Sequence, residues 1–181
     1  LAANSWGALE IASKEAEAIY ALPSKTNLNP QIAIDSNGLV HVIWGNGTKI
    51  LHRIRANGLW SPAPTLLSRE AMQWFGAPVC TLSANNDLYA FWIEKGKAVS
   101  RKYSTTQAQW GQPLVLPKTY QDGFQASLAA GPCWAATGTK IQDGCDLIFI
   151  QRESLDSTKY ALNFFSSASF TTPLQAPAIS N

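Results

Sequence analysis

Short apolar runs alternate with clusters of Asn, Gly, Ser and Pro along most of the chain. Runs of roughly four to eight residues bounded by such clusters predict β-strands. The runs "VHVIW" (40–44) and "LIFIQ" (147–151) are almost continuously apolar, which is typical of strands covered on both faces. Only "SKEAEAIYAL" (13–22) has a helix-like pattern, and we expect at most about two turns of helix there, in a linker. The pattern therefore predicts an all-β chain.

The same arrangement of runs occurs more than once. The stretch "PQIAIDSNGLVHVIW" (30–44) aligns with "PVCTLSANNDLYAFW" (78–92) at a constant spacing of 48, so that Trp44 falls on Trp92. In both stretches a tight turn, "DSNG" or "SANND", separates two strands, and its Asn and Gly residues tolerate positive φ angles. Each stretch therefore predicts a β-hairpin, and the two tryptophans are interpreted as periodic core residues.

The parallel continues beyond these hairpins. Residues 47–68 match residues 96–117, with Trp60 on Trp110, and each full unit reads as four strands. A third, looser unit follows, and the N-terminal region matches only the last strand of a unit. The predicted division is 5–13 (outer strand of a preceding unit), 30–68, 77–117, and 124–177 with an insertion at 132–144.

Four-stranded units of about fifty residues, with a tryptophan near the start of the last strand, are typical of β-propeller blades. The first unit, with its "IAIDSNGLVHVIW" and "GLWSPAP" segments, resembles the repeats of the sialidase-like propeller superfamily, known as BNR or Asp-box repeats. The repeats are degenerate, since the Ser and Asp positions of the Asp-box hold Arg53 and Arg55 before Trp60. The resemblance implies a propeller segment of about three blades plus one leading outer strand. Such propellers include hydrolases, lectins and scaffolds.

Three blades and one strand do not close a ring, because propellers need roughly four to eight blades. We therefore expect the chain to be part of a larger ring, completed by further blades from the same chain or from another chain. Two copies that together form a six-bladed ring are one version of this hypothesis.

The composition indicates which partners and which cellular location to expect. Charged residues make up only 14% of the chain, the net charge is +2, and the basic residues are scattered, so a nucleic-acid groove is not expected. No apolar run is long enough for a transmembrane segment. Seven tryptophans with abundant Ser, Thr and Asn favour an extracytoplasmic protein, whether secreted, periplasmic or on the cell surface. The turn sequence Asn46-Gly47-Thr48 is a candidate glycosylation site in a eukaryotic secretory setting.

Cysteines and histidines offer little reactive chemistry. Cys133 and Cys145 flank the predicted insertion and are candidates for a disulfide, although the sequence leaves open whether they are bonded. Cys80 falls in a predicted strand and is interpreted as a small buried residue. The only histidines, His41 and His52, are interpreted as packed strand residues, so neither a metal nor a cofactor is expected.

A complete catalytic site is not predicted. A sialidase needs an arginine cluster, but Arg53 and either Arg101 or Lys102 occupy comparable third-strand positions and repeat with the scaffold. Glycoside hydrolysis by other routes needs two carboxylates. Acidic residues that fall in predicted loops could supply such a pair or could simply be solvated: Glu70, Glu94, Asp122, Glu153 and Asp156. We therefore assign no catalytic residue and favour a non-catalytic chain, with glycoside hydrolysis as the activity expected if the chain is an enzyme.

Two linkers, 68–77 and 117–124, hold aromatic residues beside polar ones, a combination that suits stacking against sugar rings. The alternative is that these aromatics wedge between blades. The candidate ligand-binding residues are Arg69, Glu70, Trp74, Phe75, Tyr120, Asp122 and Arg152. The leading hypothesis is a non-catalytic binding or assembly module that recognises glycan or protein through the propeller loop face. The alternatives are a fragment of a glycoside hydrolase completed by missing blades, and a structural subunit of a larger complex.

Overall fold

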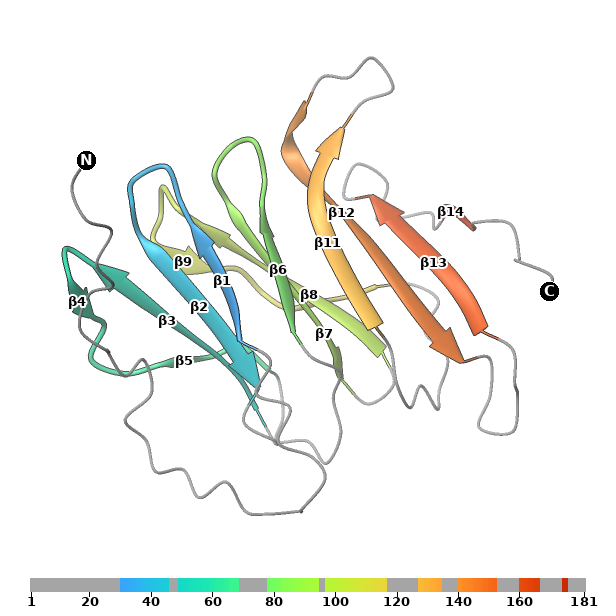
Figure 1. The fold of residues 1–181 in the computed structure, drawn as a ribbon, viewed down its shortest axis with the longest axis horizontal. Coiled ribbons are helices and arrows are strands. Elements are labelled where there is room, and N and C mark those ends of the chain that lie inside the picture. Colours follow the sequence, from blue (N-terminus) through green and yellow to red (C-terminus); the bar gives the residue numbers. More distant parts are fainter. Residues whose placement is uncertain are drawn as a thin grey trace, which may run out of the picture.

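The computed structural model describes residues 30–45, 49–68, 78–94, 97–116, 127–134, 140–152, 160–166 and 174–175. These residues form three antiparallel sheets that follow one another along the chain, and none of them is helical (Figure 1). In this part of the chain no helix is long and apolar enough to cross a membrane. The all-β prediction is confirmed. The helical turns expected at 13–22 lie outside the described residues.

The first sheet is a meander in which each long strand pairs with the next. Its strands are β1 (Gln31–Ile34), β2 (Val40–Gly45), β3 (Ile50–Ala56), β4 (Leu59–Trp60) and β5 (Thr65–Leu66). Both β4 and β5 pair with β3, so the outer strand is split in two. The segment between them contains two prolines, which have no N–H to donate to a ladder and are confined to sheet edges and irregular positions.

The second sheet repeats this arrangement. Its strands are β6 (Val79–Leu82), β7 (Leu88–Glu94), β8 (Lys97–Ser104), β9 (Gln109–Trp110) and β10 (Leu114–Val115). The register is also the same, because the pair Ile32 and Val42 in the first sheet corresponds to the pair Cys80 and Ala90 in the second, 48 residues later. The spacing seen in the sequence is therefore the spacing of two equivalent hairpins.

The third sheet contains β11 (Ser127–Trp134), β12 (Lys140–Arg152), β13 (Tyr160–Ser166) and β14 (Leu174–Gln175), paired in chain order. Its first hairpin is long: β11 and β12 both extend into the predicted insertion at 132–144, and the register shifts between Pro132 and Trp134. Much of the insertion therefore lengthens a hairpin. Within this sheet, side-chain burial is described only for residues 130–131 and 145–147.

The first hairpin turns have the predicted chemistry. In the first sheet the N–H of Gly38 donates to the carbonyl of Asp35, and Gly38 has a φ of 77°. In the second sheet the N–H of Asn86 donates to the carbonyl of Ser83, and Asn86 has a φ of 70°. Gly and Asn are the residues that tolerate this left-handed conformation best. The prediction of two equivalent turns is confirmed.

The turns between the third and fourth strands differ in length. Asn57 and Gly58, with φ angles of 49° and 81°, form a two-residue turn between β3 and β4. The corresponding turn between β8 and β9 is two residues longer, yet Trp110 still pairs with Tyr103 as Trp60 pairs with Arg55. The extra residues lie in the turn, so the position of the tryptophan in the sheet is preserved.

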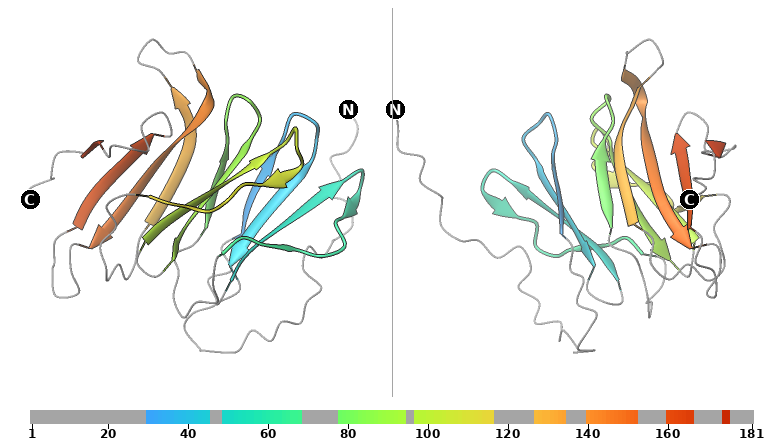
Figure 2. Two further views of the ribbon diagram at one scale, coloured as in Figure 1. Left: turned by 180° about the vertical axis from the view of Figure 1, so that it is seen from behind. Right: turned by 45° about the vertical axis from the view of Figure 1, so that its right-hand side comes forward.

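The three sheets stand side by side in chain order, and their first strands, β1, β6 and β11, contact one another in sequence (Figures 1 and 2). Two apolar clusters fill the spaces between the sheets. The cluster between the first and second sheets contains Ile43, Ile50, Leu67, Leu88, Ala90, Trp92, Val99 and Tyr103. The cluster between the second and third contains Tyr89, Phe91, Ile93, Ala98, Leu116, Cys145 and Leu147. Strand β7 supplies both clusters and is buried along its whole length, as its apolar composition suggests.

Candidate functional site

Both histidines of the chain lie between the first and second sheets. His41 in β2 and His52 in β3 are 0% and 2% exposed. His52 is paired with Ile43, two residues from His41, so the two imidazoles lie on the same face of the sheet. Their rings are stacked with centroids 5.3 Å apart, and Nδ1 of His41 lies 3.0 Å from Nε2 of His52.

This pair belongs to a longer series of polar contacts. The indole Nε1 of Trp110, in the second sheet, donates to Nδ1 of His52 at 3.0 Å. At the other end, Nε2 of His41 faces Oδ2 of Asp35 at 3.6 Å. We call these four residues, Asp35, His41, His52 and Trp110, the inter-sheet polar chain.

The hydrogen bonds of the inter-sheet polar chain have a fixed direction because an indole N–H can only donate. Nδ1 of His52 must therefore be unprotonated, and the proton of the neutral ring is on Nε2, facing His41. Nδ1 of His41 must in turn accept, which puts the proton of His41 on Nε2, opposite the carboxylate of Asp35. Every contact is consistent only if both histidines are neutral.

Asp35 is oriented by the first hairpin turn. Its Oδ1 accepts the N–H groups of Asn37 at 2.9 Å and Leu39 at 2.8 Å, so the side chain itself closes the turn. This arrangement leaves Oδ2 facing His41. Asp35 therefore has two roles: its Oδ1 stabilises the turn, and its Oδ2 faces His41 between the sheets.

The environment keeps the histidines uncharged. Burial, followed by the neighbouring His41, lowers the pKa of His52 to about 3. Burial also lowers the pKa of His41, against the opposing effect of Asp35. The ring of Tyr103 contacts both imidazoles, and burial, followed by the charge of Asp35, raises the pKa of Tyr103. At neutral pH both imidazoles are therefore uncharged, with Nε2 of His41 opposite the carboxylate of Asp35.

The interpretation of His41 as a packed strand residue is confirmed, and the same holds for His52. What the sequence analysis missed is their contact with each other and with Trp110. At the equivalent positions of the next unit stand Tyr89 and Ser100, so the histidine pair occurs once and is not a feature of the repeat. The chemistry of this network therefore belongs to a single interface.

The inter-sheet polar chain is built to hold two sheets together rather than to act on a substrate. Asp35, His41 and His52 are buried, and Trp110 is half-buried. Among the described residues, no group of three or more His, Cys, Asp or Glu side chains could bind a metal ion. The arrangement supplies neither an open acid–base group nor a metal centre in this part of the molecule.

The repeated arginines also serve the scaffold. Nε of Arg53 donates to the carbonyl of Ser61 at 2.8 Å, and its guanidinium carbon lies 6.0 Å from the centre of the Trp60 ring. Nε of Arg101 donates to the carbonyl of Gly111 at 2.9 Å, with its guanidinium 5.9 Å from the ring of Trp110. Each arginine thus stacks on the tryptophan of its own sheet and binds the carbonyl that follows it.

Arg101 makes a further contact between sheets. Its Nη1 donates to the carbonyls of Leu66 and Leu67, at 3.3 Å and 3.2 Å, which belong to the first unit. The prediction that these arginines repeat with the scaffold is confirmed. Arg101 is therefore engaged by backbone carbonyls instead of being available to bind a substrate carboxylate.

One acidic residue was placed incorrectly by the sequence analysis. Glu94, expected in a loop, is the last residue of β7 and is buried, and its Oε2 accepts the indole N–H of Trp92 at 2.9 Å. A buried tryptophan N–H needs an acceptor, and a glutamate two residues further along the same strand lies on the same face. Glu94 is thus a partner of the core and not a solvated loop carboxylate.

Most of the predicted binding residues lie outside the described part of the chain: Arg69, Glu70, Trp74, Phe75, Tyr120 and Asp122, together with the glycosylation candidate Asn46. Arg152 is the last residue of β12 and pairs with Tyr160, but its side chain is not described. These assignments stay predictions.

The side chains of two cysteines, Cys80 and Cys145, are described in the structure, and that of Cys133 is not. Cys80 lies in β6, is half-buried against the first cluster, and has its pKa raised to about 11 by burial, which confirms its interpretation as a packing residue. Cys145 is buried in β12 and is paired in register with Pro132. Cys133 lies next to Pro132 in β11, but its side chain is outside the described residues, so the disulfide stays a prediction.

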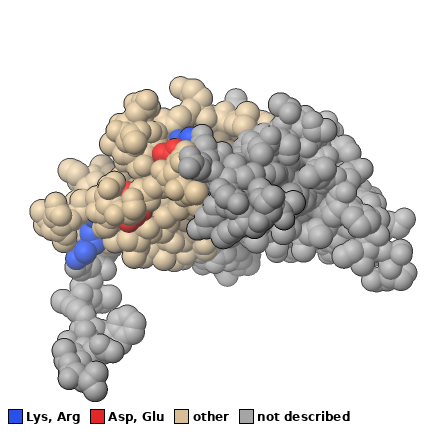
Figure 3. Space-filling model, turned by 90° about the horizontal axis from the view of Figure 1, so that it is seen from above, with Lys and Arg blue, Asp and Glu red and all other residues tan. Residues whose placement is uncertain are grey.

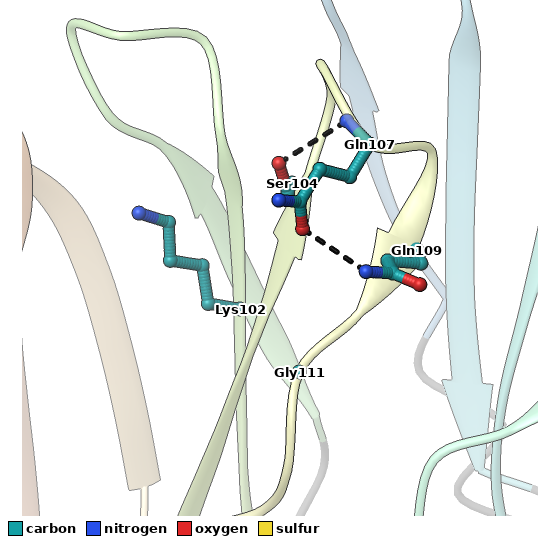
Figure 4. Close-up of a pocket in the computed structure, with 5 residues that line it drawn as sticks. All are labelled: Lys102, Ser104, Gln107, Gln109 and Gly111. Atoms are coloured by element: carbon teal, nitrogen blue, oxygen red, sulfur yellow. Dashed lines mark hydrogen bonds between the residues drawn. The ribbon is translucent and has the colours of Figure 1, made fainter.

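An open polar hollow of about 310 Å³ lies beside β8 and β9 (Figure 4). Lys102, Ser104, Gln107, Gln109 and Gly111 line it. Its polar groups are bound to protein neighbours: the side chain of Gln109 donates to that of Gln107 at 3.0 Å, and the N–H of Gln107 donates to Oγ of Ser104 at 3.3 Å. Lys102 forms an ion pair of 2.9 Å with Asp87.

The face that carries the first hairpin turns is mostly uncharged where it is described, with acidic and basic groups in small separate patches (Figure 3). The adjacent turns are joined there, since Oδ1 of Asn86 accepts the N–H of Ser36 at 2.7 Å. A broad basic surface for a polyanion is not present on the described part of this face.

No protein-family model matches the chain, and no curated protein is significantly similar to it.

Proposed function

We propose that the chain is a segment of a β-propeller of the sialidase-like type and works as a non-catalytic binding or assembly module outside the cytoplasm. The observation that carries this proposal is the sealed position of both histidines, which are 0% and 2% exposed and neutral between two sheets. Both histidine side chains are thus committed to contacts between the two sheets. A scaffold of this kind acts through its loops and its exposed faces.

The propeller half of the proposal is supported by three successive meanders with the same strand order. Their first strands contact one another in turn, and apolar clusters separate neighbouring sheets. Blades of a propeller have this relationship, with the first strand of each blade innermost. The proposed ring contains further blades beyond the three sheets.

The binding half rests on the aromatic linkers. Trp74 and Phe75 in one linker, and Tyr120 with Asp122 in the next, provide ring faces beside polar groups. Such pairs suit a glycan, whose sugar rings have apolar C–H faces and hydroxyl groups that need hydrogen-bond partners. A protein epitope is the second kind of ligand that this surface fits.

A glycan array probed with the purified chain tests this function. We expect binding that is lost in Trp74→Ala and Tyr120→Ala and retained in the control Leu59→Ala, which truncates an exposed residue at the start of β4. Binding that survives both aromatic substitutions would remove the linkers from the proposal.

A panel of fluorogenic glycosides provides the opposing test. We expect no turnover. Turnover that disappears in Glu70→Gln or Asp122→Asn would instead identify the chain as part of a glycoside hydrolase, with these carboxylates as the catalytic pair.

A further inference from the structure

The two faces of β1 differ in what covers them. Ala33 packs into the cluster between the first and second sheets, whereas Ile32 and Ile34, which alternate with it, are 67% and 60% exposed. Successive residues of a strand point to opposite faces, so the two isoleucines face away from the second sheet. Two adjacent exposed isoleucines on one strand face are unusual for a surface that stays in water.

The equivalent face of the second sheet is covered. The residues 48 positions after Ile32 and Ile34 are Cys80 and Leu82, and both pack in the cluster against the first sheet. The register of the two hairpins is the same, so the two faces are equivalent in structure as well as in sequence. The face with the isoleucines is therefore built like a surface that receives a neighbouring sheet.

The tryptophans point to the same conclusion by an independent route. Trp110 donates its indole N–H across the sheet interface to His52. Trp60, the equivalent residue of the first sheet, has a buried Nε1 that finds no hydrogen-bond partner in the described part of the chain. A buried indole N–H that lacks an acceptor costs free energy. Trp60 thus lacks the acceptor that a sheet on the other side would supply, as the first sheet supplies one to Trp110.

We propose that the isoleucine face of the first sheet, defined by Ile32, Ile34 and Trp60, binds the third sheet of a second copy of this chain. This inference rests on the assembly half of the proposed function, and it extends an interface that the molecule already uses twice. In the described part of the chain the sheets are stacked in order, so the first and third sheets are the two ends of the stack.

The sequence of the third sheet fits this role. Leu147 packs on the second sheet, and the alternate register positions of β12 are occupied by Ile148 and Ile150. Both register sets of β12 are therefore apolar, as they are in β7, which is covered by sheets on both sides. A strand at a solvated end would instead alternate apolar and polar residues.

The association is head-to-tail, since an end formed by the first sheet meets an end formed by the third. Such heterologous contacts close into a ring when the rotation allows it and otherwise continue as a filament. Because adjacent sheets here fan around their first strands, a closed ring of two copies is the expected product.

The experiment is sedimentation velocity of the intact chain over a range of protein concentrations. We expect a concentration-dependent species of twice the chain mass. The double variant Ile32→Glu/Ile34→Glu should abolish it, while the control Leu114→Glu, which charges an exposed residue on the outer strand β10, should leave it unchanged. The melting temperature of the double variant at low concentration should match the wild type, because both isoleucines are exposed in the single copy.

A pair of tryptophan variants separates association from folding. Trp60→Phe should weaken the dimer about tenfold in Kd with little change in monomer stability, because it removes only the N–H that needs an acceptor in the partner. Trp110→Phe should lower the stability of the monomer, because its acceptor is within the chain.

A chain that sediments as a monomer at every concentration would overturn the inference, and so would a dimer that persists in the double variant. Glycan binding by a monomeric chain would leave the proposed binding function intact, so failure of the two proposals can be told apart.

Discussion

The interface between the first and second sheets and the interface between the second and third are formed by the same repeat, yet they are stabilised differently. In the first, Trp110 donates a hydrogen bond to His52, which is hydrogen-bonded to His41, and Nε2 of His41 faces Oδ2 of Asp35 at 3.6 Å. In the second, the residues equivalent to the histidines are Tyr89 and Ser100. Tyr89 joins an apolar cluster there, in which its ring stacks on Phe91 with centroids 6.4 Å apart.

This difference separates two ways of specifying a sheet stack. An apolar interface gains free energy in proportion to the area buried and tolerates small shifts. A buried polar chain must have all its partners in place, because each unpaired group costs free energy in the interior. The histidine interface therefore fixes the relative position of two sheets, and it makes their association sensitive to protons.

The largest effect is expected from breaking the apolar interface. Phe91→Ala removes a fully buried ring between the second and third sheets and should lower the free energy of unfolding by about 3–5 kcal/mol. Chemical denaturation at pH 7 and pH 5 measures the loss. The loss should be the same at both pH values, since the described residues that pack around Phe91 include no histidine or carboxylate. A strong pH dependence would contradict the comparison.

The second prediction concerns acid. The pKa of His52 is lowered from 6.5 to about 3 in the folded protein. As the pH falls below 6.5, His52 therefore binds a proton in the unfolded chain but stays neutral in the folded one. The stabilisation that this residue provides is complete above pH 6.5 and should shrink by about 2–3 kcal/mol between pH 7 and pH 4.5. The lowered pKa of His41 acts in the same direction.

A matched variant isolates this effect from other groups that titrate in the same range. In His52→Gln the side-chain carbonyl can accept from Trp110 and the amide can donate to His41, but the residue does not titrate. We expect a stability near that of the wild type at pH 7 and a shallower loss in acid. If His52→Gln and the wild type lose stability in parallel, the histidine interface is not the proton-sensitive element.

The smallest effect is expected from one end of the polar chain. Trp110→Phe keeps the ring and removes the N–H, leaving Nδ1 of His52 without its donor, and should lower the free energy of unfolding by about 1–2 kcal/mol. Because His52 is then free to take a proton on Nδ1, the stability of this variant should fall less steeply with acid. Thermal melts across pH 4.5–7 measure both, and a variant as stable as the wild type would show that the hydrogen bond contributes nothing.

Features that depend on neighbours in the chain could be predicted from the sequence. The turn chemistry at Gly38 and Asn86, the 48-residue spacing of the hairpins and the burial of Trp44 and Trp92 all follow from local patterns. In a meander each strand pairs with the next, so turn length sets the register and register sets which residues share a face.

The contacts between sheets could not be predicted in this way. Trp110 and His52 are separated by 58 residues in the chain and meet only because one sheet is stacked on the other. Glu94 was expected in a loop, yet strand β7 extends to this residue and its carboxylate accepts the indole N–H of Trp92. From the sequence alone, a polar residue is expected to be exposed to solvent, because its buried partner is not known.

The sequence by itself thus determined the sheets: their strands, turns and repeated register, all set by interactions between residues close in the chain. Only the tertiary structure decided which faces of the first two sheets are covered and that the two neutral histidines are hydrogen-bonded between these sheets. It also showed that, among the described residues, Ile32, Ile34 and Trp60 lack the neighbouring sheet that their equivalents have. The physical reason is that packing between sheets depends on their arrangement in space. The sequence of a strand that is apolar on both faces does not indicate which partner covers either face.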